Sequence, residues 1–235
     1  MNPFSPPPRL ILFDLDDTLC DYASARALRL RLALARDHHG GTPLPETVDV
    51  ERMVADSLAM HPHGADHFPE LFRRHGVADP AIAEAAAAWY RANRFHGLTL
   101  FPDAISTIAT LRDATNPGGG AVFRGIGVIT NGPAEVQRAK VELLAIEQVV
   151  DFVVISGEFG VAKPDPRIFA EALRLAGATA AETVFIGDSI EHDMVGARAA
   201  SIRAVWINRT GRAWPATEPR PEAEVTGLTP LCDLL

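Results

Sequence analysis

The feature that most constrains the fold of this chain is a set of five short apolar segments, each running directly into polar residues. The segments are residues 10–13, 126–129, 152–155, 184–186 and 204–207. Apolar runs of this length, without alternation of polar residues, are typical of parallel strands covered by helices on both faces. Helical stretches separate the segments, and a repeat of strand, helix and strand predicts right-handed crossovers. We therefore expect an α/β fold with a doubly wound (Rossmann-like) parallel sheet.

Several of the intervening helices have recognisable ends. Asp103 precedes a helix expected over residues 104–111, and Pro133 suits the first turn of a helix that runs to about Ala145. Asp165 followed by proline indicates an N-cap and a first helical position, and Gly177 can end that helix in a left-handed conformation. Residues 224–235 are expected to add a short edge strand and a helix.

The interval between the first two apolar segments contains only helical patterns, which cover residues 22–39, 46–60, 68–75 and 80–95. We expect residues 19–97 to form an inserted all-helical cap domain, and residues 1–18 and 98–235 to form the catalytic core. Such a cap would exclude water and select substrates. The arginines at 26, 29, 31 and 36 are interpreted as the solvent-facing side of the first cap helix. The histidines at 61, 63 and 67 are interpreted as surface residues, because their spacing does not fit a closed zinc site.

Polar side chains follow the predicted strands at the edge where ligands bind in doubly wound sheets. Asp14 and Asp16 follow the first strand, Thr130 follows the second, and Asp188 follows the fourth. In open α/β sheets the ligand site lies beyond the carboxyl ends of the strands. We therefore expect these four side chains to converge on one crevice.

The residues around these strand ends match four motifs in order. The first is Asp14-Leu-Asp-Asp-Thr18, the second is Thr130 in Ile-Thr-Asn-Gly, and the third is Lys163 in Lys-Pro-Asp-Pro. The fourth is Gly187-Asp188-Ser189, with Asp193 five residues after Asp188. With these motifs the chain resembles the haloacid dehalogenase (HAD) superfamily, specifically its phosphatases with a helical C1 cap (subfamily I). The motifs span residues 10–193, and the helical interval falls where that family places its first type of cap.

The acids and the lysine have roles that phosphate ester chemistry requires. An anionic ester resists attack by an anion, so catalysis depends on a cation and on a nucleophile held in line with the leaving group. Asp14 can attack and form an aspartyl-phosphate, and Asp16 can protonate the leaving oxygen and later activate water. Lys163 can offset charge on the phosphoryl oxygens and on Asp14. A solvated surface lysine is the alternative for Lys163.

The same motif residues predict a metal site and a phosphate site. Mg²⁺ prefers oxygen ligands, so Asp14 and Asp188 are expected to bind it, and the resemblance implies the backbone carbonyl of Asp16 as a further ligand. Thr130 can donate its hydroxyl to a phosphoryl oxygen, assisted by the backbone N–H groups of Asn131 and the following glycine, although it can also cap the next helix. Asp193 is expected to support the site through water or by orienting Lys163, and a charge at a helix start is the alternative.

Composition sets limits on partners and location. The net charge of −8, from 30 acidic and 22 basic residues, argues against binding to a nucleic acid backbone. No apolar stretch is long enough for a membrane span, and the N-terminus lacks the pattern of a secretory signal. The two cysteines, Cys20 and Cys232, match no metal spacing and are expected to be free thiols in a reducing compartment. We therefore expect a cytoplasmic protein whose partner is a small phosphorylated metabolite.

The leading functional prediction is a Mg²⁺-dependent phosphatase for small phosphate monoesters. A dehalogenase of the same superfamily also attacks through an aspartate, but it needs neither a metal nor an acid at the position of Asp16. A phosphomutase is chemically close, since it returns the phosphoryl group to a sugar. A non-catalytic binding module would be expected to lack one of the essential groups, and Asp14, Asp16, Lys163 and Asp188 are all present.

Overall fold

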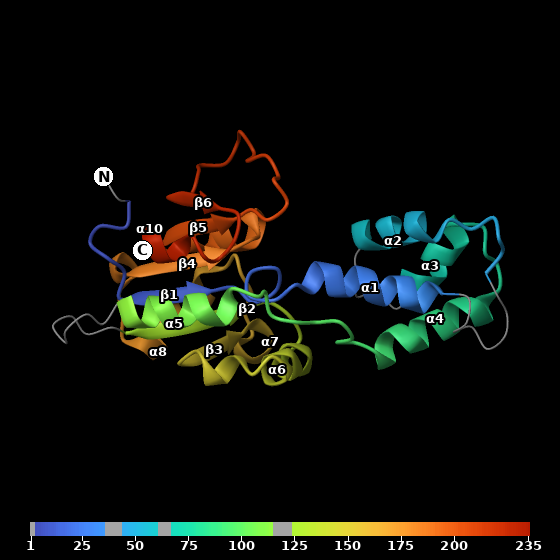
Figure 1. Ribbon diagram of the computed structural model, residues 1–235, viewed down its shortest axis with the longest axis horizontal. Helices are drawn as coiled ribbons and strands as arrows, with labels where there is room; N and C mark the ends of the chain where they lie inside the picture. The colour runs from blue at the N-terminus through green and yellow to red at the C-terminus, as the bar shows by residue number, and fades with distance from the viewer. Residues whose placement is uncertain (1–2, 36–43, 61–66, 115–123) are drawn as a thin grey trace. The chain divides into compact units, whose positions relative to one another are not determined.

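The computed structural model describes residues 3–35, 44–60, 67–114 and 124–235, and within them one six-stranded sheet. Its strands are β1 (Leu10–Phe13), β2 (Gly125–Thr130), β3 (Phe152–Ile155), β4 (Thr183–Gly187), β5 (Arg203–Ile207) and β6 (Ala223–Val225). They lie in the order β3-β2-β1-β4-β5-β6, and every pairing is parallel (Figure 1). The predicted doubly wound parallel sheet is confirmed.

Strand β1 lies inside the sheet, between β2 and β4. In register, Phe13 lies opposite Val128 of β2 and Ile186 of β4, so all three strands reach the same edge together. All four residues of β1 are fully buried, as expected for a strand with neighbours on both sides and helices on both faces. The residues that follow β1, β2 and β4 are therefore brought to one edge of the sheet.

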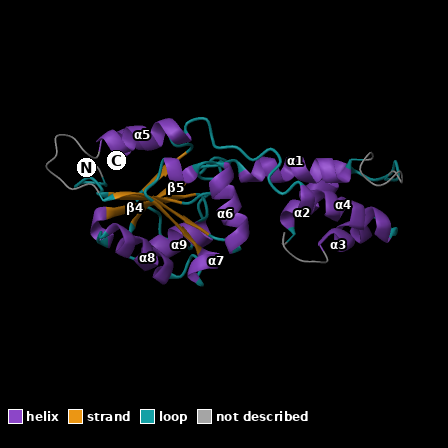
Figure 2. Ribbon diagram, turned by 90° about the horizontal axis from the view of Figure 1, so that it is seen from below, coloured by secondary structure: helices purple, strands orange, loops and turns teal. Residues whose placement is uncertain are grey.

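Helices cover both faces of the sheet. Figure 2 shows α5 (Ala104–Ala114) on one side, and α8 (Pro166–Ala176) and α9 (Val195–Ala199) on the other. The second face is packed by a core that includes Phe169, Phe185 and Trp206, with the rings of Phe169 and Phe185 5.1 Å apart. The other helices of this part of the chain are α6 (Ala134–Leu143), α7 (Ser156–Phe159) and α10 (Leu231–Leu234), with 3-10 turns at Ile146–Gln148 and Ala180–Glu182 and a π-helix at Ile190–Met194.

The expected helix ends of α8 are present. Asp165 accepts a hydrogen bond from the N–H of Arg167, Pro166 is the first helical residue, and Gly177 ends the helix with φ 60°. The C-terminal edge strand and helix are present as β6 and α10. Residues 115–123, in the loop before β2, lie outside the described residues.

The chain divides into two compact units. One comprises Met1–Asp21 and Leu100–Leu235 and carries the sheet, and the other comprises Tyr22–Thr99. The second unit contains α1 (Tyr22–Leu34), α2 (Val50–Ala59), α3 (His67–Arg74) and α4 (Pro80–Ala92), which pack around residues such as Phe68, Leu71 and Phe72. Their assignment as catalytic core and cap domain stays a prediction.

Two interpretations within the helical unit are wrong for individual residues. Arg29 is only 3% exposed, and its guanidinium lies 5.5 Å from the ring of Tyr22 and 5.0 Å from that of Tyr90, so it belongs to the interior of this unit. His67 is also buried, at 7% exposed, and its Nε2 lies 2.7 Å from the hydroxyl oxygen of Ser57. The charge of Arg29 had indicated a solvent-facing position, but aromatic rings can cover an arginine and stabilise its charge. Residues 36, 61 and 63 lie outside the described residues.

Two further expectations concern the whole chain. Cys20 and Cys232 are both free, and Cys20 is buried. In the part of the chain that the structure describes, no helix has the length and apolar character needed to cross a membrane. The cytoplasmic location stays a prediction.

Candidate active site

The first acids of the site lie on a tight loop that follows β1. The N–H of Asp14 still donates to the carbonyl of Ile186 in β4, 2.9 Å away, so this residue is held by the sheet. The loop then turns back on itself, with the N–H groups of Leu19 and Cys20 both donating to the carbonyl of Leu15. Asp14 is 6% exposed and the Asp16 side chain 24% exposed, so the loop presents two carboxylates of different accessibility.

Lys163 supplies the cation at the centre of the site. Its Nζ lies 2.5 Å from Oδ1 of Asp14 and 2.7 Å from Oδ1 of Asp193, and donates to the carbonyl of Ile129 at 2.9 Å. The side chain is 2% exposed. An ammonium group has three N–H donors, of which Asp14 and the carbonyl of Ile129 accept two, while Asp193 adds an ion pair. A solvated surface lysine is therefore excluded.

The loop after β4 brings the remaining carboxylates to the same place. One side-chain oxygen each from Asp14, Asp188 and Asp193 lies within 4.8 Å of the other two. Asp193 is 1% exposed, and its Oδ2 accepts a hydrogen bond from the N–H of Ser189 at 3.0 Å. Asp193 thus contacts both Lys163 and the loop that carries Asp188, a geometry that suits the predicted role of orienting the lysine.

The crowding of acids shifts their protonation. Burial raises the pKa of Asp14 from 3.8 to about 7, with further increases from Asp193 and Asp16 and a decrease from Lys163. Burial followed by the charges of Asp14 and Asp193 raises the pKa of Asp188 to about 8. Burial lowers the pKa of Lys163, but the charges of Asp14 and Asp193 outweigh it and keep the pKa above its ordinary value. One ammonium thus compensates only part of the negative charge.

This set of donors fits a divalent cation. Three carboxylate oxygens close together are hard ligands, and a cation among them would relieve the repulsion that raises the pKa of Asp14 and Asp188. The side chain of Asp16 does not belong to this group, because both of its oxygens accept hydrogen bonds from Lys140 on α6. Its predicted contribution is the backbone carbonyl, which stays a prediction.

The Thr-Asn-Gly segment at the end of β2 contributes to the same pocket. Thr130 is 1% exposed. The Asn131 side chain makes two hydrogen bonds to the backbone of Lys163, with Nδ2 donating to its carbonyl and Oδ1 accepting from its N–H, both at 2.9 Å. Asn131 therefore fixes the loop that carries the lysine, a contact that the sequence did not predict. The N–H of Gly132 donates to the hydroxyl of Ser156 at 2.9 Å, which engages a group expected to help bind phosphate.

Two residues of α6 contact Asp16, and sequence reasoning missed both. Lys140 is 3% exposed, and its Nζ donates to both carboxylate oxygens of Asp16 at 2.6 and 2.9 Å. Gln137 is 1% exposed, and its Nε2 donates to Oδ2 of Asp16 at 3.2 Å and also to the hydroxyl of Thr130. The two positions lie three apart, on one face of a helix. Polar residues on the buried face of an amphipathic helix are the signal that could have identified them.

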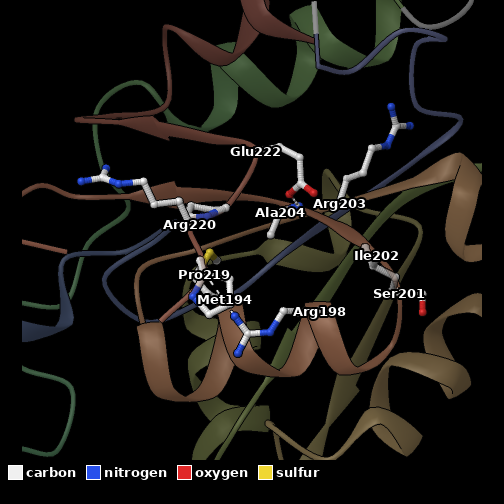
Figure 3. A pocket seen from close by; sticks show the side chains of 10 residues that line it. Met194, Arg198, Ser201, Ile202, Arg203, Ala204, Pro219, Arg220 and Glu222 are labelled. Carbon is white, nitrogen blue, oxygen red and sulfur yellow. Dashed lines mark hydrogen bonds between the residues drawn. The ribbon is translucent and has the colours of Figure 1, made fainter. Parts of the chain in front are cut away.

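A pocket of about 170 Å³ opens at this edge of the sheet. The residues that line it are Asp14, Asp16, Asp17, Thr130, Asn131, Lys163, Asp188, Ser189, His192 and Asp193. Every residue predicted to act through its side chain is therefore in its wall. A second pocket, of about 220 Å³, is lined by residues of α9, the start of β5 and the 219–222 segment (Figure 3). In that pocket Arg198 is paired with Glu218, and none of the predicted site residues takes part.

Several known proteins are similar to this chain in sequence. Residues 8–201 match a family model described as a haloacid dehalogenase-like hydrolase. A glyceraldehyde 3-phosphate phosphatase of Methanopyrus kandleri is 34% identical over 223 residues, which cover 92% of this chain and 90% of that protein. The human N-acylneuraminate-9-phosphatase is 28% identical over 240 residues, which cover 97% of this chain and 93% of that protein.

Solved structures are similar over nearly the whole chain. A HAD-hydrolase of Bacillus subtilis, YfnB, solved bound to magnesium, has a TM-score of 0.76 at 22% identity, with 97% of this chain and 98% of that one covered. A 2-haloacid dehalogenase of Pseudomonas syringae has a TM-score of 0.55 at 31% identity, with 96% of each chain covered. The similarity to YfnB concerns the fold alone, whereas the similarity to the dehalogenase extends to the amino-acid sequence.

Proposed function

The chain belongs to the haloacid dehalogenase-like hydrolase family, within which it is a phosphoric monoester hydrolase, and we propose that it works through an aspartyl-phosphate on Asp14 with Mg²⁺ bound beside it. The observation that carries the proposal is the convergence of Asp14, Lys163 and Asp188 from three separate segments on one pocket. Each of them meets one requirement of attack on an anionic ester: a nucleophile, a fixed cation and a metal ligand.

The first half-reaction transfers the phosphoryl group to the protein. Lys163 holds Oδ1 of Asp14, which leaves Oδ2 to attack phosphorus. A bond forms between Oδ2 and phosphorus, the ester P–O bond breaks, and Asp16 gives a proton to the departing alkoxide oxygen. Thr130 donates its hydroxyl to a phosphoryl oxygen, and Lys163 offsets the charge that gathers there.

The second half-reaction returns Asp14 to its starting state. Asp16, now a carboxylate, accepts a proton from a water molecule that attacks phosphorus, and the bond between Asp14 and phosphorus breaks. Inorganic phosphate then leaves. Asp14 and Asp188, with the Asp16 carbonyl, would hold Mg²⁺, which neutralises charge on the phosphoryl oxygens when bound. Asp193 keeps Lys163 in place through the contact of 2.7 Å.

The substrate is a small phosphorylated metabolite. The named activities of the two relatives point to glyceraldehyde 3-phosphate and N-acylneuraminate 9-phosphate as first candidates. These esters share the phosphoryl group that the pocket would hold and differ in the rest of the molecule. A panel of such esters, assayed for released phosphate, identifies the preferred one.

Dehalogenase activity is the second candidate, because the P. syringae dehalogenase is 31% identical. That chemistry has no leaving alkoxide to protonate and no phosphoryl charge to neutralise. The Asp16 carboxylate held by Lys140, and three carboxylates able to share a cation, both favour the phosphatase. Chloride release from 2-chloropropionate, measured beside phosphate release from p-nitrophenyl phosphate, separates the two activities.

The decisive experiment is the variant Asp14→Asn. We expect the wild-type protein to hydrolyse p-nitrophenyl phosphate with Mg²⁺ and to lose this activity in EDTA. Asp14→Asn removes the nucleophile and should abolish turnover while its circular dichroism spectrum matches that of the wild type. Full activity of the variant would refute the assignment of Asp14, and metal-independent turnover of the wild type would refute the role of Mg²⁺.

A further inference from the structure

The buried amide of Gln137 joins two of the groups in the proposed mechanism. Its Nε2 donates to the hydroxyl oxygen of Thr130 at the end of β2 and to Oδ2 of Asp16 in the loop after β1. Gln137 itself lies on α6 and is 1% exposed. One side chain therefore links a predicted phosphate ligand with the predicted acid.

The identity of the donor fixes the direction of these hydrogen bonds. Nε2 of Gln137 lies 3.2 Å from Oδ2 of Asp16 and also faces Oγ1 of Thr130, and an amide nitrogen can only donate, so both oxygens accept. The same nitrogen then donates to Oγ1 of Thr130, which accepts with a lone pair. The hydroxyl hydrogen of Thr130 is consequently left to donate elsewhere, and Thr130 lines the pocket.

The backbone beside Thr130 is shaped to admit this amide. Gly132 has φ 148°, a conformation that favours glycine. A Cβ atom at this position would also lie 2.9 Å from Cγ and 3.0 Å from Cδ of Gln137. Glycine is thus required next to the side chain of Gln137, and the segment after β2 and the amide of α6 fit together as one unit.

The packing of α6 does not call for an amide at this position. A buried amide costs free energy unless it is hydrogen-bonded, whereas an apolar side chain of similar shape fills the same space without that requirement. Here the hydrogen bonds of the amide go to two groups with roles in the proposed chemistry. This distribution indicates a role in the reaction.

We propose that Gln137 is a positioning residue: it orients the hydroxyl of Thr130 so that its hydrogen points to a phosphoryl oxygen, and it holds the carboxylate of Asp16 beside that oxygen. The inference rests on the proposed function, because it assigns to Thr130 a phosphoryl contact. It adds a residue of α6 to the site.

A double-mutant cycle tests the link between Gln137 and Thr130. The variants are Gln137→Met, which keeps the length of the side chain, Thr130→Val, and the two combined. The readout is the dissociation constant of inorganic phosphate, measured by calorimetry with Mg²⁺ present. We expect Gln137→Met to weaken phosphate binding about tenfold when Thr130 is present, less than the loss typical of a direct donor to a developing charge. In the Thr130→Val background the same change should alter the constant by less than about twofold.

Controls separate this role from packing. Val141 is 1% exposed one turn further along α6, and Val141→Ala should lower the Tm without changing phosphate affinity. Gln137→Leu serves as a second variant if Gln137→Met does not fold. This inference alone is overturned if Gln137→Met weakens phosphate binding equally in both Thr130 backgrounds. It is also overturned if Gln137→Met leaves phosphate affinity unchanged while the wild-type protein hydrolyses p-nitrophenyl phosphate. Failure of the wild type to hydrolyse any monoester would instead overturn the proposed function.

Discussion

Removing the negative charge of Asp188 should stabilise the metal-free protein while destroying the metal site. The pKa of Asp188 is raised from 3.8 to about 8 by burial and by the charges of Asp14 and Asp193. Between these two values the folded state binds more protons than the unfolded state, so stability falls as the pH rises. Asp188→Asn removes this dependence, because the amide does not ionise.

The expected size follows from the shift. Each pKa unit corresponds to about 1.36 kcal/mol, so a shift of roughly four units sets an upper limit of roughly 5 kcal/mol at pH 8. The full shift overstates the effect, because Asp14 shares the same repulsion and can relieve it by taking up a proton, and because Asp188 is only partly buried. We therefore expect Asp188→Asn to increase the free energy of unfolding at pH 8 by about 2–3 kcal/mol. For a protein of this size that gain raises the Tm by roughly 5–10 °C.

The assay is thermal unfolding of wild type and Asp188→Asn between pH 4 and 8, in EDTA and in MgCl2. In EDTA the Tm difference should be small near pH 4 and should grow toward pH 8 in favour of the variant. In MgCl2 the wild type should gain stability through metal binding and the variant should gain little. A variant that is less stable than the wild type at pH 8 in EDTA, or that keeps the full Mg²⁺ effect, would refute the electrostatic reasoning.

Two further predictions concern groups that hold the site together. Lys163→Met leaves Asp14 and Asp193 without their shared cation, and should lower kcat/KM about a hundredfold or more and the free energy of unfolding in urea at pH 7 by about 3–5 kcal/mol. Because the pKa of Lys163 lies above 10.5, its contribution to the free energy of unfolding persists through neutral pH and is lost only as the pH rises through that higher pKa. Unchanged activity of Lys163→Met would contradict the role of this lysine. Gly187→Ala places a Cβ 2.3 Å from Oδ2 of Asp193 and should reduce both kcat/KM and Tm. Gly227→Ala is the control, because its Cβ would lie 3.6 Å from its nearest neighbours, and it should change neither quantity. Retained activity in Gly187→Ala would show that Asp193 can move without consequence.

The positions of residues at strand ends could be predicted from the sequence, because they depend on local sequence patterns. Apolar runs indicated the strands, and the carboxyl ends of parallel strands share one edge, so Asp14, Thr130 and Asp188 could be brought together without coordinates. The sheet, its helices and the capped ends of α8 follow from the same local patterns. The order of the strands came from the structure.

Contacts between distant segments required the tertiary structure. Gln137 and Lys140 lie 121 and 124 residues from Asp16 along the chain, and only the packing of α6 against the sheet shows that they meet it. Asn131 was expected to contribute its backbone N–H, whereas its side chain fixes the backbone of Lys163. The packing of Arg29 against the rings of Tyr22 and Tyr90 was likewise visible only in the tertiary structure. Sequence periodicity tells which face of an element is buried, but the partner that a buried polar group finds is decided by how the elements pack in three dimensions.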